Sequence, residues 1–367
     1  GQLTIPTKDL APSATNQFIL DGKIKDLAAV QNDADFVAAQ NFLAALSSAS
    51  GDITVQQAIE AAGINSRVHA ILNSWIGNYY GTSNERLGVQ GLADSLNLLA
   101  RNKNELLLRS NPMQDVLASR FSSVLPDVEL NTVVKSIDFS SGKVVLAGQK
   151  TNGGAVENFA VDVNKVIVTV PISILKAGAI VFTPALPKTK TTALSRIDMG
   201  ACVRIVLDFK KNFWGNETGF IYGGTQGPEY LSSGYARSEL NKTLSVTIHG
   251  AKAEELSGLR EQAIDKVLEE LDNLYEGQAS LNIRTDENQN RIYEFFDWTK
   301  HPYIKGSASY LRPGAGNQDR VALAEPMEQL VFFAGEATDT EGEAGTINGA
   351  LLSAQRAVVE VVNAILG

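Results

Sequence analysis

Hydrophobic positions spaced three and four residues apart dominate the chain from Asp33 to about Arg120. Gly, Ser or Asn residues separate four such stretches, which predicts a group of helices in the first third of the chain. The expected helices cover residues 36–46, 55–62, 68–79 and 89–101. Residues 1–30 show little periodicity, and we expect them to form an irregular connecting arm.

The pattern changes to short β-rich runs after residue 128. These runs predict strands, and Asn152-Gly153-Gly154 between two of them predicts a hairpin turn. An amphipathic helix is expected over residues 254–275. The predicted strands cover residues 129–137, 142–146, 159–163, 166–170, 201–209, 219–222, 244–248 and 291–297.

The C-terminal segment combines a strand, a polar loop and a helix. Residues 330–334 form a β-rich run that stops at Gly335 and Glu336. A glycine lets a ligand approach the backbone, and a carboxylate can accept hydrogen bonds from hydroxyl groups. Thr346 can cap a helix whose apolar positions continue to Ile365, and its N-terminus would favour an anion such as a phosphate or the edge of a reduced flavin. On residue chemistry alone, an ordinary strand, loop and helix is the commoner explanation.

Composition excludes several classes of protein. The 367 residues are 44% hydrophobic and carry a net charge of −9, which argues against nucleic acid as a partner. The single cysteine, Cys202, excludes an intrachain disulfide. No uninterrupted apolar run approaches about 18 residues, so we expect no membrane span.

Other site chemistries find little support in the sequence. The three histidines are isolated, with no metal-ligand spacing. The sequence contains no Gly-x-Ser-x-Gly nucleophile turn. Asp339, Glu341 and Glu343 lack the ligand spacing of a calcium loop, and we interpret them as a solvated loop.

Six linked motifs occur in one order between residue 125 and the C-terminus. The series comprises 131–137, Val166-Ile167-Val168-Thr169-Val170-Pro171, Phe182-Thr183-Pro184, Met199-Gly200 with 204–214, Trp298-Thr299-Lys300-His301-Pro302 with 306–310, and Phe333-Ala334-Gly335-Glu336 with Gly345-Thr346-Ile347-Asn348-Gly349-Ala350. This order and spacing resembles the flavin-containing amine oxidases, a family of monoamine and polyamine oxidases, L-amino-acid oxidases and flavin histone demethylases.

The resemblance implies a mixed α/β fold with two interleaved domains, one FAD-binding and one substrate-binding. Residues 105–175 and 323–367 would belong to a truncated FAD domain. Residues 176–322 would form the mixed-sheet substrate domain, and residues 1–104 its helical part.

The resemblance also assigns residues to the cofactor. Val134 would meet the adenine through its backbone, and Glu336, after Gly335, would lie along the ribityl and pyrophosphate groups. Thr346 and Ile347 would place backbone N–H groups at the pyrimidine edge of the flavin.

Three further residues would lie beside the flavin ring and the substrate. Tyr310 would form one wall of an aromatic cage and Trp298 would pack near the ring, although the residues by themselves favour core packing at a strand end for both. Arg204 occupies the position where the family commonly has a lysine linked to oxygen reactivity. Arginine cannot mimic a compact ammonium. The alternative is a strand residue paired with an acid such as Asp208 or Asp198.

The family's N-terminal Gly-x-Gly-x-x-Gly turn is not found in this sequence. The nearest string, residues 314–319, lacks the third glycine, and we interpret it as a loop. We therefore expect a fragment or one subunit of a split enzyme, which binds FAD poorly unless a partner chain supplies the dinucleotide-binding unit.

The expected function is an FAD-dependent oxidoreductase that acts on a small amine or an L-amino acid. An amino acid would need an arginine for its carboxylate, and Arg67, Arg86 and Arg237 are candidates that the sequence alone does not place. The alternatives are a flavin dehydrogenase or desaturase-like relative with poor oxygen reactivity, motivated by Arg204, and a non-catalytic binding or scaffold protein of the same fold.

Overall fold

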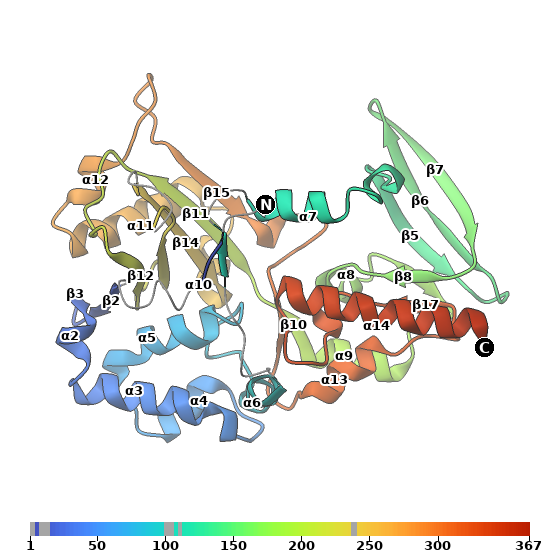
Figure 1. The fold of residues 1–367 in the computed structure, drawn as a ribbon, viewed down its shortest axis with the longest axis horizontal. Coiled ribbons are helices and arrows are strands. Elements are labelled where there is room, and N and C mark those ends of the chain that lie inside the picture. The colour runs from blue at the N-terminus through green and yellow to red at the C-terminus, as the bar shows by residue number, and fades with distance from the viewer. Residues whose placement is uncertain (1–3, 7–14, 99–105, 109–111, 236–240) are drawn as a thin grey trace.

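Two lobes make up the computed structural model, which describes residues 4–6, 15–98, 106–108, 112–235 and 241–367. Figure 1 shows one lobe around a seven-stranded sheet and another around a four-stranded sheet and a parallel strand pair. Helix α7 (Met113–Arg120) lies between the lobes at one side. The order of the elements therefore matches the mixed α/β class expected from the sequence.

The seven-stranded sheet has the strand order β15-β11-β14-β13-β12-β2-β3. Its strands are β2 (Thr15–Leu20), β3 (Lys23–Asp26), β11 (Cys202–Asp208), β12 (Thr218–Tyr222), β13 (Glu229–Ser232), β14 (Thr243–His249) and β15 (Tyr293–Asp297). We expected residues 1–30 to form an irregular arm. This prediction is wrong for the segments that form β2 and β3. Strand β2 pairs in parallel with β12, about 200 residues away in sequence, and buries Phe18 and Leu20. Strand β2 also pairs antiparallel with β3 across the turn Asp21-Gly22, so the segment is held by one local and one distant pairing.

Two helices cover one face of this sheet. They are α10 (Gly250–Leu256) and α11 (Arg260–Leu274), followed by the short α12 (Gln278–Asn282). The sequence predicted one continuous helix here, but Gly258 adopts φ 79° and donates its N–H to Asp297 Oδ2 at 2.8 Å. This left-handed turn breaks the helix and redirects α11 across the sheet. The apolar face of α11 then packs on the inward residues of β11, including Val203 and Ile205.

The helical layer forms the second core of this lobe, together with Phe18 of β2. It confirms the four predicted helices, although residues 99–101 lie outside the described residues. Asp33 caps α3 through Asp35 N and Phe36 N, and Thr54 forms a capping box with Gln57 on α4. The elements are α2 (Leu27–Val30), α3 (Ala34–Ala45), η1 (Leu46–Ser48), α4 (Val55–Ala61), η2 (Ser66–Val68), α5 (His69–Asn73), the π-helical turn η3 (Ser74–Asn78) and α6 (Val89–Leu98).

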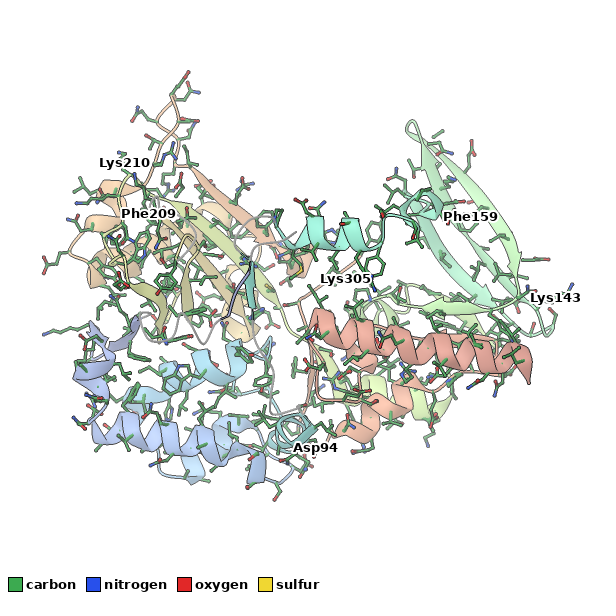
Figure 2. All side chains as sticks on the ribbon, viewed as in Figure 1. Asp94, Lys143, Phe159, Phe209, Lys210 and Lys305 are labelled. Carbon is green, nitrogen blue, oxygen red and sulfur yellow. The ribbon has the colours of Figure 1, made fainter. Side chains whose placement is uncertain are left out.

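The other lobe combines an antiparallel meander with a parallel strand pair. The predicted hairpin at residues 152–154 is confirmed, because Asn152 pairs with Ala155 across the turn. Figure 2 shows Phe159 and Lys143 on this meander, far from Phe209 and Lys210 of the seven-stranded lobe. The strands are β5 (Thr132–Asp138), β6 (Val144–Asn152), β7 (Ala155–Val163) and β9 (Val181–Thr183) in one sheet, and β8 (Val166–Val168) with β17 (Val331–Phe333) in the other.

Four helices pack around the strand pair. They are α8 (Ile172–Lys176), α9 (Lys188–Arg196), α13 (Asn317–Ala324) and α14 (Ile347–Leu366). The loop expected over residues 314–319 is partly wrong, because α13 begins at Asn317 with Gly316 as its N-cap. Asp319 accepts the Gly316 N–H at 3.0 Å, which satisfies a donor at the start of the helix.

Short elements complete the described chain. Strands β10 (Ile197–Met199) and β16 (Ser309–Leu311) pair between the lobes, and β1 (Thr4–Pro6) pairs with β4 (Leu106–Leu108). The remaining turns are η4 (Leu125–Asp127), η5 (Trp298–Lys300) and η6 (Glu336–Thr338).

Helix α14 corrects one expectation about apolar segments. It has 20 residues, and an 18-residue window within it has a mean hydropathy of 1.3, so by length and composition it could cross a membrane. The expectation of no span counted uninterrupted apolar runs, whereas this helix carries scattered polar residues. Gly349, Ser353 and Ala357 are buried on one face, while Val359 and Ile365 on other faces are 59% and 66% exposed. The helix therefore docks on its lobe and leaves an apolar surface uncovered.

Candidate functional site

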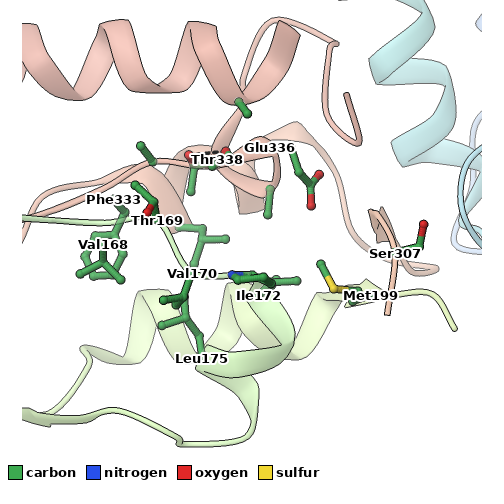
Figure 3. Close-up of a pocket in the computed structure, with 16 residues that line it drawn as sticks. Val168, Thr169, Val170, Ile172, Leu175, Met199, Ser307, Phe333, Glu336 and Thr338 are labelled. Atoms are coloured by element: carbon green, nitrogen blue, oxygen red, sulfur yellow. Dashed lines mark hydrogen bonds between the residues drawn. The ribbon is translucent and has the colours of Figure 1, made fainter. Parts of the chain in front are cut away.

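The carboxyl ends of the parallel strands β8 and β17 open into a cavity of about 230 Å³. Loops at the carboxyl ends of parallel strands are common ligand sites, because both chains turn away there and leave a crevice. Figure 3 shows the cavity between the end of β8, helix α8 and the turn η6. Its wall consists of Val168, Thr169, Val170, Pro171, Ile172, Leu175, Met199, Ser307, Leu323, Phe333, Ala334, Gly335, Glu336, Ala337, Thr338 and Ala350.

Gly335 marks the point where β17 enters this cavity. Its backbone has φ 122° and ψ 162°, a conformation that is essentially restricted to glycine. Its N–H donates to Ser353 Oγ of α14 at 2.9 Å, which joins the end of the strand to the helix. The sequence expectation that Gly335 lets a ligand approach the backbone stays a prediction.

Glu336 lines the cavity, but its carboxylate is engaged by the protein. Oε1 accepts the Ser309 N–H at 3.1 Å, and Oε2 accepts from Ser309 Oγ at 2.7 Å and from the Gly345 N–H at 2.7 Å. Glu336 therefore connects β16 to the loop that precedes α14. Its hydrogen bonds fix the shape of the cavity wall at the start of that helix.

Arg320 donates hydrogen bonds to Ser309, the residue that binds the Glu336 carboxylate. This arginine was not among the residues predicted from the sequence. The side chain is only 4% exposed, and it donates to Ser309 Oγ at 2.7 Å, to Ser309 O and to Ala337 O. Burial lowers the pKa of Arg320, while the charges of Glu336 and Asp339 favour its charged form. Arg320 follows three polar residues in the sequence Asn317-Gln318-Asp319, so no local signal marked it as buried.

The acidic loop after η6 differs from the solvated loop expected for Asp339, Glu341 and Glu343. Asp339 is 2% exposed and Glu343 6% exposed, and only Glu341 is exposed. Asp339 Oδ2 accepts the N–H groups of Glu341 and Glu343 at 3.2 and 2.6 Å. The loop is thus a hydrogen-bonded turn that leads directly to Thr346, the N-cap of α14. The described residues contain no group of three His, Cys, Asp or Glu side chains placed to hold a metal ion.

Thr346 begins α14 as the sequence predicted. Its Oγ1 accepts the Gly349 N–H at 3.0 Å and donates to Glu343 O at 2.6 Å. The N–H groups of Ile347 and Asn348 have no acceptor within the helix, as at any helix start. Ala350, on the next turn, lines the cavity, so the positive end of the helix lies beside it.

The structure does not bring Val134, Tyr310 and Trp298 to the cavity wall. Val134 lies in β5 near a β-bulge and packs in the core of the meander. Tyr310 is 5% exposed and packs in the core of the helical layer, which matches the core-packing alternative. Trp298 stacks on Phe296 at the edge strand β15, with ring centres 6.2 Å apart.

Arg204 lies on β11 with its side chain exposed on the sheet face opposite α11. Its Nε donates to Ser245 Oγ at 3.1 Å. The acid partners considered for it are taken: Asp208 pairs with Arg284 and Asp198 with Lys176. The structural alternative of an Arg204 ion pair with either acid is therefore wrong.

His249 lies next to a residue of the cavity wall, although the sequence placed no metal-ligand or catalytic residue near it. Its Nε2 lies 3.0 Å from Ser307 Oγ, and Ser307 lines the cavity. Burial lowers the pKa of His249 to about 4, and the charge of Arg204 acts in the same direction. His249 is thus neutral near pH 7. Cys202 pairs with His249 across β11 and β14, and burial raises the pKa of its thiol to about 11.

Comparisons with known proteins assign the chain to a family. The family described as flavin containing amine oxidoreductase matches residues 76–362. Lysine-specific histone demethylase 1 homolog 3 of Arabidopsis thaliana is 25% identical over 249 residues, which cover 65% of this chain and 15% of that protein. Probable polyamine oxidase 4 of Arabidopsis thaliana is 31% identical, covering 62% of this chain and 43% of that protein. The chain thus spans less than half the length of these relatives.

Solved structures show the same fold. The cyclohexylamine oxidase of Brevibacterium oxydans IH-35A superposes with a TM-score of 0.74 at 17% identity, over 100% of this chain and 84% of that chain. A putrescine oxidase bound to putrescine gives a TM-score of 0.74 at 14% identity, over 99% of this chain and 88% of that chain. The family match and the fold together show that this chain belongs to the flavin-containing amine oxidoreductases.

Proposed function

We propose that this chain forms the substrate-binding part and the C-terminal flavin-binding part of an FAD-dependent amine oxidoreductase. The observation that carries the proposal is the cavity at the carboxyl ends of β8 and β17, beside the first turn of α14. Residues 105–175 and 323–367 would contribute to the FAD side, and residues 1–104 and 176–322 to the substrate side.

The residues of the cavity fit a flavin edge. Gly335 leaves the backbone uncovered, and the start of α14 offers N–H groups to a negatively charged ring edge. Thr346 and Ile347 would hold that edge, Gly335 and Glu336 would lie along the cofactor, and Val134 would contact the adenine. When bound, FAD accepts a hydride from the carbon next to the substrate nitrogen.

The protein's own part in the reaction is placement and the exclusion of water. The substrate nitrogen must be neutral for a hydride to leave the adjacent carbon, and an apolar slot disfavours the ammonium form. The imine product is then hydrolysed. Trp298 and Tyr310 would contribute aromatic side chains on the substrate side, away from the wall of the described cavity.

The cavity requires completion by further residues. Its volume of about 230 Å³ lies below the roughly 300–1,000 Å³ typical of ligand sites. Strands β8 and β17 form a parallel sheet of only two strands, although parallel sheets are normally larger and covered on both faces. A strand-helix-strand unit, from the same longer protein or from a partner chain, would extend this sheet and cover α14.

Two of the arginines considered for the carboxylate of an L-amino acid are already engaged by acids. Arg67 is bound by Asp21, Asp33 and Asp35, and Arg86 by Glu254. Neither guanidinium is therefore free for a substrate carboxylate. Arg237 lies outside the described residues.

The test is flavin binding by the completed protein. The chain is expressed together with the coding sequence upstream of Gly1, or with a separate dinucleotide-binding partner, and the purified protein is examined for flavin absorbance. We expect a yellow protein whose flavin is bleached anaerobically by an amine, while the chain alone quenches FAD fluorescence weakly. If the completed protein is colourless, the proposal is wrong. A non-catalytic scaffold of this fold would give that result.

A dehydrogenase or desaturase-like relative is the second candidate, and Arg204 motivates it. Its guanidinium is held by Ser245, and its planar shape cannot replace a compact ammonium. The test is stopped-flow reoxidation of the reduced protein in air, with Arg204→Lys beside the wild type. If the wild type reoxidises slowly and Arg204→Lys reoxidises faster, the second candidate is supported. Fast reoxidation of the wild type contradicts it.

A further inference from the structure

The seven-stranded sheet has one face that the helices α10 and α11 do not cover. Along β11, Val203, Ile205 and Leu207 are fully buried and belong to the core under those helices. Arg204 points to the opposite face, because successive side chains of a strand alternate. The helical layer packs against part of this second face through Tyr222 and Phe18.

A row of side chains crosses this face from strand to strand. The register pairs Phe296 with Arg204, Arg204 with Thr247, Thr247 with Glu229 and Glu229 with Tyr222. Residues paired across strands lie on the same face. Glu229 is thus two strands from Arg204, or about 10 Å at the usual spacing between strands.

Glu229 is a carboxylate without a partner among the described residues. It is half-buried, and no hydrogen bond or ion pair from the described part of the chain reaches it. Burial raises the pKa of Glu229 to about 7, and the charge of Arg204 opposes this shift only in part. Burying a carboxylate without a partner is unfavourable, so such a group signals a site for a ligand.

One aromatic ring, that of Tyr222, lies beside the same carboxylate, and further rings lie near Tyr222. Tyr222 faces Glu229 across the β12–β13 ladder and stacks on Phe220, with ring centres 5.5 Å apart and an angle of 6° between the planes. The rings of Tyr79 and Tyr80 meet 5.2 Å apart, and Tyr79 is 68% exposed and close enough to Tyr222 to influence its ionisation. Aromatic faces and a carboxylate both attract a cation.

We propose that Glu229 and Tyr222 bind a second cationic nitrogen of the substrate, at the end of the molecule away from the reacting carbon. The proposal rests on the proposed function and deepens it, because it favours a diamine over a monoamine. A bound ammonium would supply the missing partner of Glu229. Arg204, about two strands away, would repel the same ammonium and so orient an elongated substrate along the row.

The experiment measures binding directly and needs no flavin. Diaminobutane, diaminohexane, butylamine and hexylamine are titrated calorimetrically into the full chain and into Glu229→Gln at pH 8. We expect each diamine to bind the wild type more tightly than its monoamine, and Glu229→Gln to lose at least about tenfold in diamine affinity, since hydrogen bonds to charged groups are worth about 1.5–3 kcal/mol. Monoamine affinity should stay unchanged.

Two further variants make the result specific. Glu294→Gln removes an exposed carboxylate on the same face of the edge strand β15 and should leave diamine binding as in the wild type. Glu229→Asp keeps the charge and should retain part of the affinity, even if Glu229→Gln folds poorly. Equal losses in Glu229→Gln and Glu294→Gln, or no preference of the wild type for diamines, overturn the proposal.

In the flavin-loaded protein the same variants separate this proposal from the proposed function. Glu229→Gln should raise the KM for diamines, whereas Glu294→Gln should leave the KM for diamines and the kcat for monoamines unchanged. A yellow, active protein with an unchanged KM for diamines would refute the role of Glu229 alone. A protein that binds diamines but no flavin would refute the proposed function alone.

Discussion

At the residue scale, Arg320 and Glu229 differ in whether the described residues supply hydrogen-bond partners for their charged groups. Arg320 is buried and makes three hydrogen bonds to Ser309 and Ala337, so its charge supports the cavity wall. Glu229 is partly buried and has no partner among the described residues. The first arrangement stabilises the fold, and the second leaves an interaction for a ligand to make.

Replacing Arg320 tests its structural role. Arg320→Ala leaves the acceptors on Ser309 and Ala337 without a donor, and we expect a loss of about 3–5 kcal/mol in the free energy of unfolding. The control Arg284→Ala removes an exposed ion pair with Asp208 and should cost less than about 1 kcal/mol. Urea unfolding of both variants gives the comparison, and equal losses would contradict the assignment.

The raised pKa of Glu229 predicts a pH dependence of stability. Its pKa is about 7 in the folded protein and near 4.5 when unfolded, so the folded state binds the extra proton between these values. Stability therefore falls as pH rises from about 4.5 through 7, by an amount on the order of 1–3 kcal/mol. Arg204 on β11 is the charged group that lowers the pKa of Glu229, while Glu229 itself raises the pKa of Tyr222 on β12, which stays neutral over this pH range.

Glu229→Gln removes this titration and should be more stable than the wild type at pH 8, with the difference vanishing near pH 4.5. Urea unfolding of both proteins at pH 5, 6.5 and 8 gives the measurement. Glu294→Gln should give a profile parallel to that of the wild type. A constant difference between Glu229→Gln and the wild type at all three pH values would contradict the raised pKa.

At the element scale, the strand, loop and helix that end the chain form one connected unit. Gly335 is tied to Ser353 of α14, and Glu336 is tied to Ser309 of β16 and to Gly345 before the helix. The start of α14 is therefore fixed from both sides of the cavity. This is the element that would place N–H groups at a flavin.

The N-cap of α14 allows a direct test of that fixation. Thr346→Ala removes the acceptor for the Gly349 N–H, and we expect a loss of about 1 kcal/mol in the free energy of unfolding. Thr346→Ser retains the hydroxyl and should lose much less. Thermal and urea unfolding measure the difference, and equal stability of Thr346→Ala and the wild type would show that Oγ1 is not a working cap.

Much of this element could be predicted from the sequence because its signals are local. The β-rich run, the glycine and the threonine before a helical apolar pattern lie within a short stretch of chain, and β17, Gly335 and α14 appear as expected. The carboxylate contacts of Glu336 could not be predicted, because Ser309 lies on a strand from another part of the sequence. The break between α10 and α11 was missed for the same reason, since Asp297 holds the Gly258 turn.

At the scale of the whole molecule, one lobe carries an uncovered apolar surface. On α14, Val358, Val359, Val362 and Ile365 are each at least 45% exposed, beside a parallel sheet of only two strands. Exposed apolar surface of this kind promotes association unless another element covers it. The lobe that contains α14 therefore presents a surface that favours association.

Val359→Lys tests the consequence of this surface. A charge on the uncovered face of α14 should lower self-association of the isolated chain, measured by light scattering across a concentration series. The control Leu281→Lys changes a residue that is 67% exposed on α12 in the other lobe and should have little effect. In the completed protein Val359→Lys should weaken flavin binding. Unchanged association and unchanged flavin binding together would contradict a docking role for this face.

The sequence by itself determined the family, the helical first third, the meander and the C-terminal strand, loop and helix, because each depends on local periodicity or on an ordered series of motifs. Only the tertiary structure decided that residues 15–26 join the large sheet, that Tyr310 packs into a core, that Asp339 and Glu343 are buried, and that Glu229 faces Tyr222 with no hydrogen-bond or ion-pair partner for its carboxylate in the described part of the chain. These features depend on strand register and burial, which are set by contacts between residues far apart in the sequence.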